Sequence, residues 1–434
     1  MRAIIQPSNI SGEIFAPASK SSMQRACAAA LVHKGISVIH NPGISNDDKA
    51  AMNVIEQMGA QLKIKNGELI IDSTKAFIHS PFTNHHSPVQ INCGESGLGI
   101  RMFAPLVALH KNEIIINGEG SLLTRPMDFF DEIFPQLGVE IISNNGRLSL
   151  KLKGPLHAKN IEIDGSLSSQ FLTGLLMAYS AADAGDITIK VNDLKSRPYI
   201  DLTLKVMKDF GLNVPANNNY ETFYFKSSIV SRQSAIINYT VEGDWSGAAF
   251  LLVAGAVAGN ISVKGLDINS TQADKKIMEV LKDCSCNISI NENEIKVEKN
   301  ILKAFHFDAT DCPDLFPPLA ALAANCNGTT VIEGVHRLAH KESNRALAIQ
   351  QELKKMNVEV ELDNNSMKIR GTKNIKGAVV HSHHDHRIAM MCAIAGLNAI
   401  GETVIENADA INKSYPNFFE HLKMLGATVL TSNI

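Results

Sequence analysis

The chain lacks an excess of charge of either sign, because 41 lysines and arginines stand against 44 aspartates and glutamates in 434 residues. A general nucleic-acid or membrane surface needs a basic excess, so this balance argues against both. No run reaches the roughly 18 apolar residues of a membrane-spanning helix, and the first residues lack the basic and apolar regions of a signal peptide. We therefore expect a cytoplasmic protein with no nucleic-acid or membrane partner.

Paired cysteines are also missing, since the seven cysteines form no Cys-x-x-Cys motif. Free, mostly buried thiols in a reducing compartment are the simple interpretation. Only the stretch "HSHHDHR", residues 381–387, has a composition typical of a metal site. Taken alone, it leaves a metal site and a pH switch open.

What the chain has is an internal repeat, in which two patterns each recur six times. The first is an amphipathic helix, a stop, and a strand hairpin; the stops lie near Gly59, Gly138, Gly211, Ser285, Asn357 and Gly426. The second is an apolar helix followed by a strand, as in "SGAAFLLVAGAVAGNISVKG". Helices that are apolar around most of their circumference should be buried. Six two-helix units in a chain of this length predict an α/β fold with two domains of three units each.

The boundaries of these domains follow from the ends of the repeats. A linker at residues 227–239 separates the third copy from the fourth. The first copy lacks its leading strand, and the N-terminal strand "MRAIIQP" could pair in the C-terminal domain. We expect a C-terminal domain of residues 1–18 plus 239–434 and an N-terminal domain of residues 19–238. The connection between them would be a two-stranded hinge.

The apolar helices begin with unusually many charged and hydroxyl residues, at equivalent places in all six copies. They begin near Ser19-Lys20-Ser21, "CGESGLGIR", Ser168-Ser169-Gln170, Asp244-Trp245-Ser246, "DATDCPD" and Asp385-His386-Arg387. A helix N-terminus offers unpaired N–H groups and partial positive charge, and hydroxyl and basic side chains add donors. One such start is an ordinary cap, but six in register indicate a common anion-binding surface. In the sixth copy we expect Asp385 to be the helix cap and His381, His383 and His384 to be loop residues before it that bind no metal.

These segments together resemble a known family. "APASKSSMQR", "ESGLGIR", "LTRPM", "GSLSSQFLTGLLMA", "SRPYIDLTL", "EGDWSGAAF", "DCPDLFPPLA", "HKESNRA", "HDHRIAM" and "NKSYPNF" occur in the order typical of the 5-enolpyruvylshikimate-3-phosphate (EPSP) synthases. The resemblance implies two domains, each of three βαβαββ units in an inside-out α/β barrel. It also implies transfer of the enolpyruvyl group of phosphoenolpyruvate to the 5-hydroxyl of shikimate 3-phosphate.

The resemblance assigns site residues one by one. Shikimate 3-phosphate would be bound by Lys20, Ser21, Arg25, Ser168, Ser169, Gln170, Ser196, Tyr199, Asp314, Arg337 and Lys341. Phosphoenolpyruvate would be bound by Lys20, Gly97, Arg125, Gln170, Arg345, Arg387 and Lys413. The catalytic set would be Lys20, Asp314, Glu342 and His386, with Glu342 as the acid toward C3 and Asp314 as the base toward the hydroxyl. We expect small-molecule substrates and a monomeric protein. We expect no metal and no organic cofactor.

Two alternatives stay open at this point. The sister enolpyruvyl transferase acting on UDP-N-acetylglucosamine has the same fold, but its expected Lys-Asn pair is Lys20-Ser21 here. A non-catalytic binding scaffold would explain the repeats but would leave the acids without a purpose. The chain also departs from the family pattern, with Glu95 and Leu98 in the glycine-rich segment and Asn344 in "KESNR".

Overall fold

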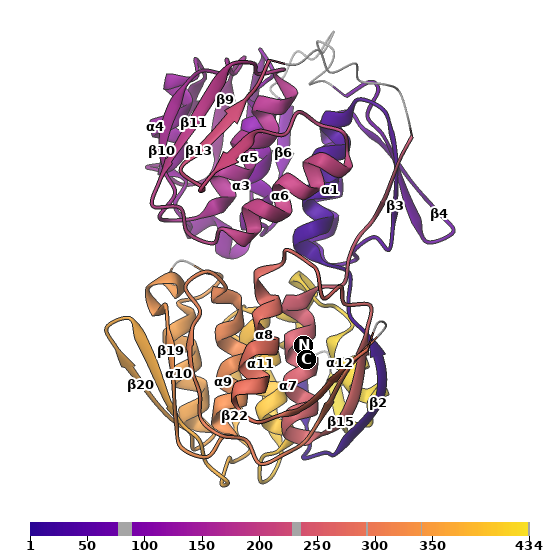
Figure 1. The fold of residues 1–434 in the computed structure, drawn as a ribbon, viewed down its shortest axis with the longest axis vertical. Helices are drawn as coiled ribbons and strands as arrows, with labels where there is room; N and C mark the ends of the chain where they lie inside the picture. Colours follow the sequence, from indigo (N-terminus) through magenta and orange to yellow (C-terminus); the bar gives the residue numbers. More distant parts are fainter. Residues whose placement is uncertain (77–88, 228–235, 292–293, 340, 433–434) are drawn as a thin grey trace. The chain divides into compact units, whose positions relative to one another are not determined.

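The computed structural model describes residues 1–76, 89–227, 236–291, 294–339 and 341–432 (Figure 1). Residues 228–235 of the predicted linker lie outside this range. The chain divides into two compact units, Met1–Ser19 with Glu242–Ile434, and Lys20–Val241. It passes from one unit to the other twice, between Ser19 and Lys20 and between Val241 and Glu242.

The Lys20–Val241 unit contains three four-stranded sheets in its described residues. The first sheet has the order β14 (Ile237–Thr240), β3 (Ile36–His40), β5 (Glu68–Asp72), β4 (Gln61–Lys65). The second has the order β6 (Val89–Asn92), β7 (Glu113–Asn117), β9 (Leu150–Lys153), β8 (Glu140–Ile142). The third has the order β10 (Ile161–Asp164), β11 (Ile187–Asn192), β13 (Thr222–Phe225), β12 (Ala216–Asn218).

The other unit also contains three four-stranded sheets among its described residues. The first has the order β2 (Ile10–Phe15), β15 (Gly259–Lys264), β17 (Glu294–Glu298), β16 (Asn287–Ile290). The second has the order β18 (His306–Asp308), β19 (Thr329–Glu333), β21 (Ser366–Arg370), β20 (Glu359–Asp363). The third has the order β22 (Val379–His381), β23 (Thr403–Glu406), β1 (Arg2–Ile5), β24 (Val429–Ser432).

All of these sheets follow one plan, with a parallel pair first and two antiparallel pairings after it. In three of them the strands come from one continuous segment with two helices between them. In the other three, a strand distant in sequence completes the sheet: β14 pairs with β3, β2 with β15, and β1 with both β23 and β24. The fold is therefore mixed α/β, as the repeats predict.

Six helices with mostly buried residues form the centre of the two units. In the Lys20–Val241 unit they are α1 (Lys20–His33), α3 (Gly97–Val107) and α5 (Ser169–Ala181). In the other unit they are α7 (Trp245–Ala258), α9 (Phe316–Ala324) and α11 (His386–Leu397). Within each unit the three pack against one another, as Figure 1 shows. Every residue of α7, α9 and α11 is buried, because none of these helices has a polar face to turn to water. The predicted burial of the apolar helices is confirmed.

The amphipathic helices alternate with them along the chain. They are α2 (Asn46–Gln57), α4 (Asp128–Gln136), α6 (Pro198–Asp209), α8 (Ile277–Asp283), α10 (Arg345–Lys355) and α12 (Phe418–Met424). Short 3₁₀ segments lie between the main elements: η2 (Gly120–Thr124), η3 (Ala273–Lys276), η4 (Pro313–Leu315), η5 (Val335–Leu338) and η6 (Ala408–Lys413). Among the described helices, none combines the length and the apolar composition that crossing a bilayer requires.

Candidate active site

Side-chain caps close the N-termini of several inner helices, where the sequence places polar residues. The Ser168 hydroxyl accepts from the Gln170 N–H at 3.2 Å, and the Asp385 carboxylate accepts from the Arg387 N–H at 3.0 Å. Asp244 caps α7 in the same way through the Ser246 N–H. The expected capping role of Asp385 is confirmed. These caps satisfy first-turn N–H groups of α5, α7 and α11.

In the unit containing Glu242–Ile434, Arg345 is the centre of a buried charge network. Its Nε donates to Asp385 Oδ2 at 2.9 Å, its Nη1 to Asp314 Oδ1 at 2.8 Å, and its Nη2 to Glu342 Oε2 at 2.6 Å. The side chains of Arg345 and Asp385 are both fully buried. Charge-assisted bonds of this kind hold a guanidinium in one orientation. The network therefore fixes three of the predicted site residues relative to one another.

Asp314 is the second shared partner in this network. Lys341 Nζ lies 3.2 Å from its Oδ1, and Arg387 Nη2 lies 3.1 Å from its Oδ2. Burial tends to raise the pKa of Asp314, but the charges of Arg387, Lys341 and Arg345 together hold that pKa well below its usual range. Burial also lowers the pKa of Lys341, which Asp314 partly offsets. Asp314 is thus an ionised carboxylate surrounded by three cations.

The remaining predicted residues of this unit lie around the same network. His386 is 1% exposed, with its Nδ1 3.9 Å from Asp385 Oδ1. Lys413 is buried at the end of η6, which packs against α11. Arg337 belongs to η5, which packs against the η4 segment that carries Asp314. The predicted residues of this unit therefore lie on α11 or on segments that pack against α11 or η4.

In the Lys20–Val241 unit, Arg25 connects the beginning of α1 to the beginning of α6. Its Nη1 donates to the Ser21 carbonyl at 2.8 Å, its Nη2 to the Tyr199 carbonyl at 3.2 Å, and its Nε to the Thr203 hydroxyl at 2.9 Å. Complete burial lowers the pKa of Arg25 to about 10, so it stays charged at neutral pH. Lys20, the first residue of α1, forms an ion pair with Asp47 at 2.9 Å.

Two further contacts in this unit join predicted residues. At Gly97, an added Cβ would lie 2.3 Å from Arg125 Nη1, so only glycine lets this guanidinium approach the start of α3. Gln170 Oε1 accepts from Arg101 Nη1 at 2.9 Å, and the Arg101 guanidinium lies 5.0 Å from the centre of the Phe171 ring. Arg101 therefore fixes Gln170.

The hydroxyl residues and one departure from the family pattern are the remaining predicted features of this unit. Ser169 opens α5, and Ser196, which has a φ of 55°, lies just before α6, which packs against α5. Both serine side chains are buried. Glu95 accepts from the Ser121 hydroxyl at 3.3 Å.

Sequence reasoning missed several residues that hold the site together. The sequence predicts only a cap at Asp385, yet this residue also binds Arg345, and the sequence indicates no site role for Arg101, Asp47 or Thr203. The only available signals were a capping position for Asp385 and the end of the "ESGLGIR" segment for Arg101. Neither signal identifies the partner, because each partner lies 27 or more residues away.

The histidine-rich stretch does not form a metal site in the described residues. His381 ends strand β22, where a loop position was expected, and His383 Nε2 lies 2.7 Å from Glu352 Oε1. His383 and His384 both have positive φ, which turns the chain toward the cap at Asp385. Across the part of the chain that the structure describes, no three His, Cys, Asp or Glu side chains are grouped so as to hold a metal ion.

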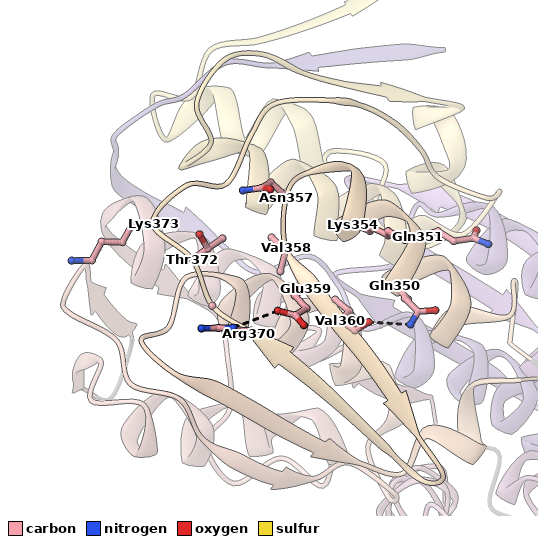
Figure 2. Close-up of a pocket in the computed structure, with 11 residues that line it drawn as sticks. Gln350, Gln351, Lys354, Asn357, Val358, Glu359, Val360, Arg370, Thr372 and Lys373 are labelled. Carbon is pink, nitrogen blue, oxygen red and sulfur yellow. Dashed lines mark hydrogen bonds and ion pairs between the residues drawn. The ribbon is translucent and has the colours of Figure 1, made fainter.

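A surface depression of about 1030 Å³ lies away from these residues (Figure 2). It is formed by α10 and the strands β20 and β21, with a lining of mostly polar and charged side chains such as Lys354 and Arg370. Figure 2 shows Gln350 bonded to the Val360 carbonyl at 3.0 Å and Arg370 near Glu359 at 3.8 Å. No predicted site residue lines it, so it is separate from the candidate site.

Comparison with known proteins adds to this geometry. The family model described as EPSP synthase (3-phosphoshikimate 1-carboxyvinyltransferase) matches residues 4–422. The 3-phosphoshikimate 1-carboxyvinyltransferase of Clostridium novyi is 34% identical over 98% of this chain and 97% of that protein. The protein of the same name from Clostridium botulinum strain Alaska E43 is 35% identical over 97% of this chain and 96% of that protein.

Among solved structures, an EPSP synthase from Acinetobacter baumannii is similar over 100% of both chains. The TM-score is 0.81 and the sequence identity is 24%. At this identity the likeness concerns the fold. It confirms the predicted fold class, a two-domain α/β architecture built from repeated units.

Proposed function

The chain belongs to the EPSP synthase (3-phosphoshikimate 1-carboxyvinyltransferase) family, and we propose that it transfers the enolpyruvyl group of phosphoenolpyruvate to the 5-hydroxyl of shikimate 3-phosphate. This is a step of the shikimate pathway toward chorismate and the aromatic amino acids. The observation that carries the proposal is the network of Lys341, Arg345 and Arg387 with Asp314 and Glu342. It supplies cations for an anionic substrate and two carboxylates for proton transfer.

The addition step of the proposed reaction needs two proton transfers of opposite direction, and the elimination step needs a third. The hydroxyl oxygen bonds to C2 of phosphoenolpyruvate as it loses its proton, and C3 gains a proton. The bond from C2 to the phosphate oxygen then breaks, phosphate leaves, and C3 loses a proton to restore the double bond. Two carboxyl groups in different surroundings are suited to such opposite tasks.

Asp314 and Glu342 are the two carboxyl groups that we propose for these tasks. Glu342, which accepts from Arg345 Nη2, is the proposed acid toward C3, whereas Asp314 is the proposed base toward the hydroxyl. In this network, Asp314 is a weak base, since three cations hold its pKa low. Anionic substrates that bind Lys341, Arg345 and Arg387 would compete with Asp314 for those cations. This competition would raise the pKa of Asp314 and make it a better base toward the hydroxyl.

The other assigned residues follow the family resemblance and stay a proposal. In the Lys20–Val241 unit, the phosphate of shikimate 3-phosphate would be bound by Arg25, Ser168, Ser169 and Ser196, with Ser21, Gln170 and Tyr199 nearby. Phosphoenolpyruvate would be bound by Gly97 and Arg125 in that unit and by Arg345, Arg387 and Lys413 in the other. Arg337 and Lys341 would contact shikimate 3-phosphate, and Lys20 and His386 would assist proton transfer. We further propose a monomer located in the cytoplasm.

Phosphate release measured with both substrates tests the proposed function. We expect turnover that requires both substrates and that falls by about 10²–10⁴-fold in Glu342→Gln, because the variant loses one proton-transfer group. Lys20→Ala should abolish turnover, because Lys20 is assigned to both substrates and to proton transfer. Glu359→Gln is the matched control, because this exposed glutamate lies outside the candidate site. It should turn over like the wild type.

The same assay separates the rival reaction. The enolpyruvyl transferase that acts on UDP-N-acetylglucosamine would release phosphate with that sugar nucleotide in place of shikimate 3-phosphate. Turnover with UDP-N-acetylglucosamine and none with shikimate 3-phosphate would overturn the proposal. Absence of turnover with either acceptor would favour the binding scaffold.

A further inference from the structure

A buried acid that the proposed mechanism does not use lies in the same unit as Arg387. Asp274 belongs to η3 and is 1% exposed. Its Oδ2 accepts a hydrogen bond from the Ser246 hydroxyl in the first turn of α7. Its Oδ1 has no hydrogen-bond partner among the described residues. A fully ionised carboxylate in this position would leave one charged oxygen both buried and unsatisfied, which is costly.

The position of Asp274 is well defined by its neighbour in sequence. Gln272 Oε1 accepts from the Trp245 N–H at 3.0 Å, and Gln272 Nε2 donates to the Gly243 carbonyl at 2.8 Å. These two bonds hold η3 against the N-terminus of α7. The orphan oxygen of Asp274 is therefore a property of a fixed segment and not of a loose side chain.

More acidic than basic groups act on Asp274. Asp244 faces it from the cap of α7, Asp314 and the Cys312 thiol from the segment at η4, and Arg387 from α11. If all acids were ionised, Arg387 would be near the three carboxylates of Asp244, Asp274 and Asp314, with Arg345 as the cation that opposes them. Such a guanidinium would attract an anionic ligand poorly. Burial, reinforced by the charge of Asp314, raises the pKa of Asp274 to about 7.

We propose that Asp274 is a positioning residue for anion binding at Arg387: it carries a proton when phosphoenolpyruvate is bound, and this leaves the Arg387 charge available to the ligand. The inference rests on the proposed function, which makes Arg387 a ligand of phosphoenolpyruvate. Because a bound anion near Asp274 favours the protonated carboxyl, binding takes up a proton. Affinity therefore falls as the pH rises through the titration of Asp274.

The test compares the pH dependence of phosphoenolpyruvate binding in the wild type and in Asp274→Asn, the neutral isostere. Phosphoenolpyruvate is titrated calorimetrically without shikimate 3-phosphate, so that no turnover occurs, between pH 6.5 and 8.5 and in buffers of different ionisation enthalpy. We expect the wild-type Kd to rise by up to about tenfold per pH unit above the titration, with proton uptake on binding. In Asp274→Asn, the rise of Kd with pH and the proton uptake that come from Asp274 should both be absent. Titration of phosphoenolpyruvate itself affects both proteins equally, so it cancels in the ratio of the two Kd values.

Two further variants keep the test decisive. Ser246→Ala removes the hydroxyl that donates to the ionised carboxylate, so it should move the inflection to higher pH without flattening the curve. Its result stands on its own if Asp274→Asn fails to fold. Asp283→Asn makes the same chemical change at the exposed end of α8 and should reproduce the wild-type curve.

The outcomes separate this inference from the proposed function. Equal slopes and equal proton uptake in the wild type and Asp274→Asn, or an unmoved inflection in Ser246→Ala, would overturn the role of Asp274. A purely structural role would lower stability but would leave the pH dependence of Kd in place. Wild-type protein that binds phosphoenolpyruvate with Asp274-dependent proton uptake, yet releases no phosphate, would overturn the proposed function alone. Lack of any phosphoenolpyruvate binding would count against both.

Discussion

At the scale of single residues, Arg345 shows how a charged side chain is kept fully buried. Its three donor nitrogens are all used, on Asp385, Asp314 and Glu342. Burial alone would lower the pKa of Arg345. The negative charges of Asp385, Glu342 and Asp314 outweigh this effect and raise the pKa of Arg345 above its usual value. Removing one acid would leave a buried charge short of a partner, which costs more than an exposed pair can contribute.

Asp385→Ala should therefore lower the free energy of unfolding by about 3–5 kcal/mol, because it removes both the Arg345 partner and the cap of α11. Urea denaturation followed by circular dichroism measures this change. Glu359→Ala is the control, since the 3.8 Å contact of Glu359 with Arg370 is exposed and should contribute nothing measurable. A variant at position 385 as stable as the wild type would show that the network does not stabilise the fold.

At the scale of elements, the six helix stops share one backbone conformation. Gly59, Gly138, Gly211, Ser285, Asn357 and Gly426 all have positive φ. A left-handed residue directly after a helix satisfies its last carbonyls, and glycine adopts it without steric strain. Ser285 and Asn357 adopt this conformation at φ of 65° and 64°, where the Cβ atom of a non-glycine residue causes steric strain. The repeat identified these stops correctly even where the residue is not glycine.

Exchanging residues at two of these stops should change stability in opposite directions. Gly211→Ala should lower the free energy of unfolding by about 1 kcal/mol, because a Cβ there meets no neighbour and only the backbone strain remains. Ser285→Gly should raise it by about 0.5 kcal/mol, since relief of strain is partly offset by the freedom of glycine in the unfolded chain. Thermal unfolding of each variant and of the wild type measures the two changes in the free energy of unfolding. Changes of the same sign would contradict the assigned conformation.

At the scale of the whole molecule, the two ends of the chain belong to one unit. Strand β1 lies between β23 and β24, and the N-terminal amine contacts Asp409 at 2.8 Å. Met1–Ser19 is thus an integral part of the unit that Glu242–Ile434 forms, whereas the Lys20–Val241 unit contains all the strands of its own sheets.

A fragment of residues 20–241 should accordingly fold alone and unfold cooperatively in urea. A fragment of residues 20–227 lacks β14, which exposes the edge of β3, and should unfold at a lower urea concentration. Circular dichroism of the two fragments measures both transitions. A 20–241 fragment without a cooperative transition would show that this unit depends on the rest of the chain.

Much of this fold could be predicted because its signals are local. The apolar composition of the segments at α7 and α11 requires burial wherever they lie, and the stops recur at regular steps along the chain. The family could be identified for the same reason, since its motifs are short and lie in order. The assigned roles of Lys20, Asp314, Glu342 and His386 stay predictions, because they depend on ligands in place.

The sequence by itself therefore determined the repeat, the buried helices, the helix stops and the family. Only the tertiary structure decided which charged groups meet: Asp385 with Arg345, 40 residues apart, and Asp274 with Ser246, 28 residues apart. The physical reason is that helix periodicity and capping act over a few neighbouring residues. The partner of a buried charge depends instead on how helices distant in sequence pack, and on which carboxylate the packing leaves unsatisfied.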